Sequence, residues 1–126
     1  MNNKDRQVVF DKYGGKCAYC GCELAKGWHV SKLLSEAPEV NERGEFVFKN
    51  DTIENKLPSC ASCNMSRTRD NYGVTYTTIE DFRKQILYNL YFVQSFSYYQ
   101  RCLRFGLIKE DIKPIVFYFE TVKQKT

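Results

Sequence analysis

Two cysteine motifs constrain this chain more than any other feature of its sequence. Both are C-x2-C, Cys17-Ala-Tyr-Cys20 and Cys60-Ala-Ser-Cys63, and 39 residues separate them. A spacer of two residues lets both sulfurs of a tight turn face one point, so two such motifs can supply four thiolates to one tetrahedral Zn²⁺. We therefore predict a structural zinc ion bound by Cys17, Cys20, Cys60 and Cys63. Cys22 does not match the spacing of the second motif, and we expect it to be a free thiol near the metal.

The composition bounds the class of protein. A chain of 126 residues, 43% of them hydrophobic, is long enough for one globular domain with a modest core. Six cysteines are too sparse and too unevenly spaced for a secreted disulfide scaffold, and the first residues lack the apolar core of a signal peptide. No apolar run approaches the length of a membrane span. We expect a cytoplasmic protein with no membrane partner, whose thiolates bind zinc rather than forming disulfides.

The distribution of charge matters more than its sum of +4. Residues 1–32 carry a net charge of +3, residues 33–55 of −4, and residues 56–69 of +3. The basic segments are compatible with nucleic-acid binding, but the acidic middle segment excludes a surface that is basic all over.

Local patterns predict short elements around the two motifs. Residues 3–13 should form a helix capped by Asn3 and ended by Gly14-Gly15. Residues 28–34 and 46–48 are strand candidates, and residues 35–45 form a loop between them. A further helix should start at or within the second motif and end near Gly73.

These motifs together resemble the HNH endonuclease family, in its zinc-bearing, phage-type branch. The resemblance rests on Gly-Lys-Cys-Ala-Tyr-Cys-Gly at 15–21, on the run from Glu54-Asn55 to Cys63-Asn64, and on Arg67, and it covers roughly residues 5–72. It implies a ββα-metal fold, in which two strands and a helix hold a catalytic Mg²⁺-type ion beside a structural zinc. We therefore expect an α+β fold with an HNH-like zinc module over residues 1–76.

The chain departs from the family at the catalytic motif. The Asp-His pair of the family, a metal ligand and a general base, falls here on Ser31-Lys32, whereas Asn55 and Asn64 match family positions in residue type. Mg²⁺ prefers anionic oxygen ligands, and a protonated lysine is a poor base for activating water. We expect a catalytically degenerate module. The alternative is an active endonuclease or nickase on DNA that uses His29, Asn55 and Asn64 with Mg²⁺ or Mn²⁺.

Residues 77–126 form an extension beyond the family core. A capping box at Thr77 or Thr78 starts a helix that is expected to run to Phe105, where Gly106 stops it. Its core positions recur at helical spacing: Ile79, Phe82, Ile86, Leu90 and Val93. Residues 115–119, which follow Pro114, are predicted to form a strand at a sheet edge.

The extension also suggests a partner. Three roles are open to its aromatic residues: they pack a core, they stack on single-stranded bases, or they bind a protein. We predict a protein partner, such as a nuclease or a nucleic-acid complex that a phage-type inhibitor would target, bound through Tyr91, Tyr98, Tyr99 and Arg101. The alternative is a non-catalytic nucleic-acid-binding module whose contacts are Lys32, Lys56, Arg67 and Arg69.

Overall fold

The chain forms a small mixed α+β fold, which confirms the predicted fold class at this coarse level. Its structure is a computed structural model that describes residues 2–68 and 78–122. The elements follow in the order α1 (Asn3–Asp11), β1 (His29–Lys32), β2 (Glu39–Val40), β3 (Phe46–Val47), η1 (Ile53–Asn55), β4 (Lys56–Ser59), α2 (Ala61–Thr68), α3 (Ile79–Gln94), α4 (Ser97–Arg104) and α5 (Tyr118–Thr121). Two compact units result: residues 79–115 form one, and the rest of the chain forms the other.

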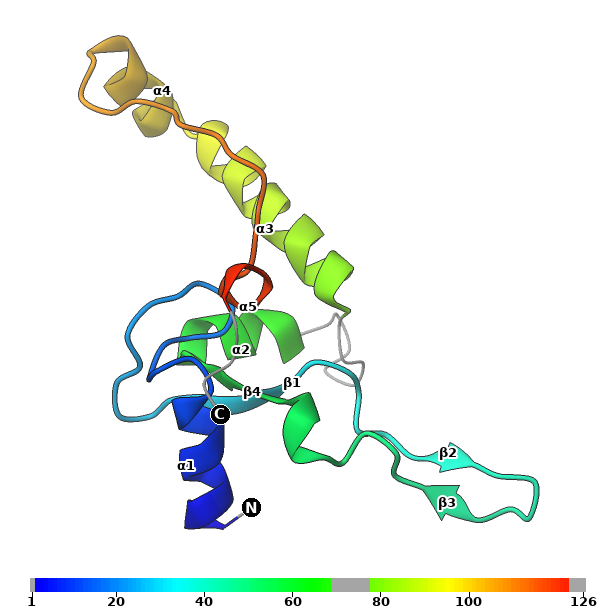
Figure 1. The fold of residues 1–126 in the computed structure, drawn as a ribbon. Coiled ribbons are helices and arrows are strands. Elements are labelled where there is room, and N and C mark those ends of the chain that lie inside the picture. The colour runs from blue at the N-terminus through cyan, green and yellow to red at the C-terminus, as the bar shows by residue number, and fades with distance from the viewer. Residues whose placement is uncertain (1, 69–77, 123–126) are drawn as a thin grey trace. The chain divides into compact units, whose positions relative to one another are not determined.

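The centre of the first unit is the antiparallel pair β1–β4. Val30 lies opposite Pro58, and Ser31 lies opposite Leu57. Helix α1 contacts β4 and helix α2 contacts β1, so the short sheet lies between the two helices (Figure 1). The buried apolar residues of this unit come from these elements, the first cysteine motif and the C-terminal tail: Val9, Tyr13, Cys17, Ala18, Tyr19, Leu57 and Phe117.

The N-cap of helix α1 lies one residue before the predicted one. Asn2, rather than Asn3, is the N-cap residue, and its Oδ1 accepts a hydrogen bond of 2.8 Å from the backbone N–H of Asp5. The helix ends at Asp11, and Gly14 and Gly15 then adopt φ values of 63° and 82°. Such left-handed conformations favour glycine, which explains why the chain can turn sharply into the first cysteine motif.

The predicted loop over 35–45 contains a strand. β2 pairs with β3 in an antiparallel hairpin that projects from the rest of its unit (Figure 1). Asn41 closes the turn, because its Oδ1 accepts hydrogen bonds of 2.9 Å from the backbone N–H groups of Arg43 and Glu45. Val40 and Phe46 are 64% and 69% exposed, so this hairpin is held by its turn rather than by a core.

In the second unit, the helix predicted to run to Phe105 is broken at Ser95. The Ser95 hydroxyl donates to the Phe92 carbonyl at 2.6 Å, and the Gln100 side chain donates to the Gln94 carbonyl at 2.7 Å. These side chains take over carbonyls that a continuous helix would use, so α3 stops and α4 starts afresh. Among the predicted core positions Phe82 is buried, but Val93 is 42% exposed.

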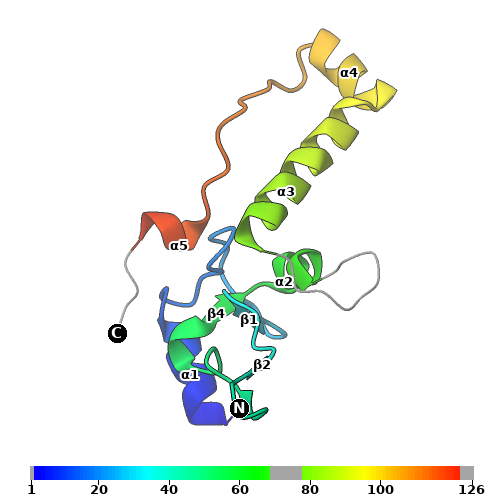
Figure 2. The same ribbon diagram turned by 90° about the vertical axis from the view of Figure 1, so that its right-hand side faces the viewer.

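The strand predicted over 115–119 is wrong. Residues 118–121 form the short helix α5, and the Glu120 carboxylate accepts a 2.8 Å hydrogen bond from the backbone N–H of Phe117. The backbone N–H groups of Tyr118 and Phe119 donate to the carbonyls of Tyr19 and Ala18, so α5 lies beside the first cysteine motif (Figure 2). A run of five apolar residues does not distinguish a strand from such a packed turn.

Within the described residues, no helix has the length and apolarity needed to cross a membrane.

Candidate metal centre

Four cysteine sulfurs come together in the first unit. The Sγ atoms of Cys17, Cys20, Cys22 and Cys60 all lie within 4.8 Å of one another. The Cys20 and Cys60 sulfurs are 3.9 Å apart. Sulfurs bound tetrahedrally to zinc at about 2.3 Å lie roughly 3.8 Å from each other, so this spacing fits a bound metal ion.

The backbone of residues 16–23 builds the first half of the cluster. Lys16 and Glu23 form an antiparallel bridge, and the Cys17 N–H donates to the Cys22 carbonyl at 2.8 Å. Gly21 turns the chain with a φ of 77°. This tight hairpin carries Cys22 back over the motif, which explains why Cys22, predicted to be a free thiol, lies among the clustered sulfurs.

The second half comes from the start of α2. Cys60 directly precedes the helix and Cys63 lies one turn further on, where its N–H donates to the Cys60 sulfur at 3.4 Å. The Tyr19 N–H donates to the Cys17 sulfur at the same distance. Hydrogen bonds of this kind favour the thiolate, because they stabilise its negative charge. A 2.8 Å hydrogen bond from the Ala18 N–H to the Pro58 carbonyl joins the two halves.

The thiols of the cluster hold their protons very unequally. A hydrogen bond from the Cys63 thiol, helped by backbone N–H groups, lowers the pKa of Cys17 to about 4. The same hydrogen bond raises the pKa of Cys63, and burial raises the pKa of Cys20 to about 12. Neighbouring thiolates repel one another, so a second ionisation is opposed until a cation neutralises the charge. The arrangement is chemically suited to a soft metal cation.

The position of Cys63 differs from the predicted one, because Cys22 takes its place among the four clustered sulfurs. Cys63 is hydrogen-bonded to Cys17, but it is not among the four sulfurs that are mutually closest. The spacing of the two motifs indicated a cysteine site, and this much is seen. The motif spacing could not indicate the position of Cys22, because this position depends on the backbone hydrogen bond between Cys17 and Cys22.

A buried polar network ties the first motif to the sheet and to α2. The Tyr19 hydroxyl lies 2.6 Å from the Ser31 hydroxyl and accepts a 2.6 Å hydrogen bond from the Arg67 guanidinium. Arg67 also donates to the Leu33 carbonyl at 2.6 Å. Its side chain is fully buried, so the prediction that Arg67 contacts a phosphate backbone is wrong. The position of Arg67 close to a cysteine motif indicated a surface role. Its guanidinium N–H groups instead donate to groups inside the fold.

Among the other predicted nucleic-acid contacts, Lys56 is engaged by neighbouring carboxylates. Lys56 forms ion pairs with Asp51 at 3.1 Å and Glu36 at 3.7 Å. Although burial acts to lower it, these two carboxylates raise the pKa of Lys56. Lys32 is half-buried, and Arg69 lies outside the described residues. The acidic segment thus neutralises the lysine nearest to it.

The residues of the alternative endonuclease site are not brought together. His29 is exposed and lies opposite Ser59, whereas the Asn55 backbone carbonyl accepts from Leu33 at the other end of the β1–β4 pair. His29 and Leu33 are four residue steps apart along this extended chain, or roughly 13 Å. The Asn55 side chain bonds the Leu34 backbone N–H and carbonyl at 2.8 Å each, which gives it a structural role. Asn64 lies in α2, half-buried.

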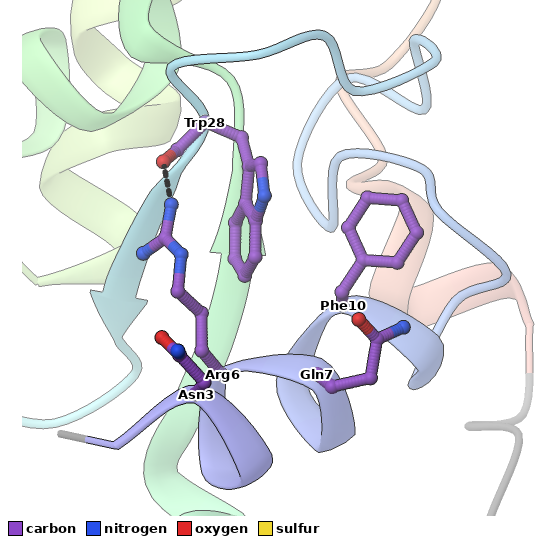
Figure 3. A pocket seen from close by; sticks show the side chains of 5 residues that line it. All are labelled: Asn3, Arg6, Gln7, Phe10 and Trp28. Atoms are coloured by element: carbon purple, nitrogen blue, oxygen red, sulfur yellow. Dashed lines mark hydrogen bonds between the residues drawn. The ribbon is translucent and has the colours of Figure 1, made fainter.

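Two basic residues that the sequence analysis did not single out join the first helical segment to the rest of the first unit. Lys12 is 5% exposed, and its ammonium donates to the carbonyls of Ile53 and Lys56 at 2.6 Å each. Arg6 stacks 4.0 Å above the Trp28 ring and donates to the Trp28 carbonyl at 2.7 Å. Figure 3 shows Arg6 and Trp28 in the wall of a pocket that residues of α1 form with Trp28, which directly precedes β1. Helical spacing alone indicated only apolar contacts for α1.

The predicted partner residues lie on the second unit and are mostly exposed. Tyr91 and Tyr98 are 72% and 74% exposed, and the Arg101 guanidinium lies 5.8 Å from the centre of the Tyr98 ring. Tyr99 is half-buried, and its hydroxyl donates to the Glu110 carboxylate at 2.9 Å. On α3, Tyr91 lines a hollow of about 380 Å³ with Lys84, Leu87 and Tyr88.

No family model matches the chain, and neither the curated proteins nor the solved structures contain a match to it.

Proposed function

We propose that the chain is a zinc-stabilised, HNH-like module without nuclease activity that acts by binding a protein partner. The single observation that carries this proposal is the exposed aromatic surface of α3 and α4, which comprises Tyr88, Tyr91, Phe92, Tyr98 and Phe105, all more than 60% exposed. Aromatic rings in such numbers dominate the energetics of protein interfaces, and Arg101 adds a residue type enriched there.

The zinc ion has a structural role in this proposal. Cys17, Cys20 and Cys60 would supply three thiolates, with Cys63 as the fourth ligand expected from the motif spacing. A closed set of four thiolates leaves no position for a water molecule or substrate, which is the arrangement of structural zinc sites. The metal would hold the first motif against the start of α2.

The absence of nuclease activity follows from the residues around β1. At the positions of the family's Asp-His pair stand Ser31, whose hydroxyl is engaged with Tyr19, and the half-buried Lys32. Neither supplies an anionic oxygen or a base, and the nearby Asp51 carboxylate pairs with Lys56. A modulator of a nuclease would keep the family fold while lacking its chemistry. The proposal that the partner is a nuclease rests on this resemblance of fold.

Partner capture tests the proposal with two matched variants. The tagged protein is incubated with extract of the source cells, treated with nuclease and washed at high salt, and the captured protein is identified by mass spectrometry. Tyr91→Ala with Tyr98→Ala should abolish capture, since each buried anchor commonly contributes about 2 kcal/mol. Phe46→Ala, which truncates an equally exposed ring on β3, should leave it unchanged. Equal capture by all three proteins would refute the proposed surface.

Activity and binding assays test the two alternatives. With Mg²⁺ or Mn²⁺ the protein should not cut plasmid or single-stranded DNA above background. Cleavage that disappears in His29→Ala would establish the endonuclease instead. A nucleic-acid-binding role would show as tight binding whose affinity falls steeply with salt and is lost in Lys32→Ala.

A further inference from the structure

The cysteine cluster contains one more thiol than a zinc ion binds. We propose that Cys22 and Cys63 share the fourth ligand position, so that one metal centre has two alternative sets of four thiolates. Cys17, Cys20 and Cys60 belong to both sets. This inference rests on the metal centre proposed above, and it adds a ligand that the spacing of the two C-x2-C motifs does not predict.

The backbone places both candidate ligands beside the same three sulfurs. The Lys16–Glu23 bridge and the 2.8 Å hydrogen bond from Cys17 to the Cys22 carbonyl fix Cys22, whose sulfur is within 4.8 Å of each of the other three. Cys63 is fixed independently by α2, through its N–H bond to the Cys60 sulfur, and its thiol is hydrogen-bonded to Cys17. Cys22 thus lies next to all three shared sulfurs, and Cys63 lies next to those of Cys17 and Cys60.

The exposure of the five thiols gives them an order. Cys20 and Cys22 are exposed, Cys60 and Cys63 are half-buried, and Cys17 is buried. A zinc ion arriving from solvent therefore meets Cys22 before Cys63. Zn²⁺ would be held by Cys17, Cys20 and Cys60 together with either Cys22 or Cys63, because its filled d shell imposes no geometric preference between two thiolates that lie beside the same site.

Single and double substitutions test the sharing directly. Zinc content and affinity are measured by elemental analysis and chelator competition for Cys22→Ser, Cys63→Ser and the double variant, with Cys102→Ser in α4 as the matched control outside the cluster. Each single variant should keep one zinc per chain with an affinity within about tenfold of the unsubstituted protein, and the double variant should lose about 100-fold or more. Loss of zinc in Cys63→Ser to the extent seen in the double variant would overturn the inference.

A second measurement needs no substitution in the cluster. The protein with one equivalent of zinc is alkylated with iodoacetamide, and the modified cysteines are located by peptide mass spectrometry. Partial modification of both Cys22 and Cys63, against protected Cys17 and fully modified Cys102, is expected. Modification of Cys22 as complete as that of Cys102, with none at Cys63, would show that Cys22 is not a ligand. Failure of the unsubstituted protein to bind zinc at all would refute the metal centre itself, which is a separate outcome.

Discussion

Lys12 shows how much a single charged residue contributes inside this small fold. It reaches from the residue after α1 to the carbonyls of Ile53, the first residue of η1, and Lys56, the first residue of β4, and so fixes the chain where it enters β4. Burial lowers the pKa of its ammonium, against the opposing charge of Glu54. An ammonium group held by buried carbonyls is a stabilising contact that only the folded chain can supply.

We therefore expect Lys12→Met to be strongly destabilising. The substitution keeps most of the side-chain volume but removes two charge-assisted hydrogen bonds to part-buried carbonyls, which should lower the free energy of unfolding by about 2 kcal/mol or more. Urea unfolding followed by circular dichroism measures the change. Lys4→Met, at an exposed lysine of the same helix, should alter stability by less than about 0.5 kcal/mol. Equal losses in the two variants would contradict this role.

The unequal pKa values of the cysteines predict a steep pH dependence of zinc binding. At pH 7 Cys17, with a pKa of about 4, has already lost its proton, whereas Cys20, with a pKa of about 12, and Cys63, whose pKa is raised, have not. Zinc must displace these protons, so affinity should rise as pH rises, by about 100-fold or more between pH 6 and pH 7. Calorimetry in buffers of different ionisation enthalpy should count about two or more protons released per zinc. A binding constant independent of pH would contradict the proposed ligands.

At the scale of elements, the turn of the first motif depends on a close approach to the tail. Gly21 has a φ of 77°, and a Cβ atom there would lie 3.0 Å from the Tyr118 ring of α5. Both the backbone conformation and the packing therefore require glycine at this position. The motif and α5 support each other, although about 100 residues separate them in sequence.

Two glycine substitutions separate these effects. Gly27 has a φ of 94°, and a Cβ atom added there would meet no atom within 4 Å. Gly27→Ala should therefore lower the free energy of unfolding only by the backbone strain of about 1–2 kcal/mol. Gly21→Ala should cost at least about 1 kcal/mol more, because the Tyr118 ring must also move. Thermal unfolding of both variants measures the difference. Similar losses at the two sites would mean that α5 does not press on the turn.

The sequence predicted these elements unevenly, for physical reasons. Residues 3–13 and the two cysteine motifs were identified because caps and metal-ligand spacing are local features. The tail from Ile115 could not be, because the backbone of Tyr118 and Phe119 bonds Tyr19 and Ala18 only once distant segments have met. Arg67 was assigned to the surface for the same reason, since its partners Tyr19 and Leu33 come from other elements.

At the scale of the whole molecule, the first unit has a small core. Its fully buried apolar side chains are few, and two of them belong to the first cysteine motif, Cys17 and Ala18. A core with so few buried apolar side chains is commonly supplemented by a metal or another cross-link. Removal of zinc should therefore affect folding and not only a local site.

Chelation should lower the melting temperature sharply, because structural zinc contributes on the order of 10 kcal/mol to the folding of small modules. Circular dichroism before and after treatment with a strong chelator measures the loss. Added Zn²⁺ should restore the folded signal, whereas Mg²⁺ and Ca²⁺ should not, because they prefer oxygen ligands to thiolates. A melting temperature unchanged by the chelator would show that the cluster carries no structural metal.

Trp28 gives the molecule a built-in optical reporter. It is the single tryptophan of the chain, and it stands immediately before β1 with the Arg6 guanidinium 4.0 Å from its ring centre. The fluorescence of the protein excited near 295 nm therefore comes from one place, the junction between α1 and the sheet. Any event that moves α1 away from β1 changes the surroundings of this indole, so its emission can follow the opening of the first unit without an attached dye.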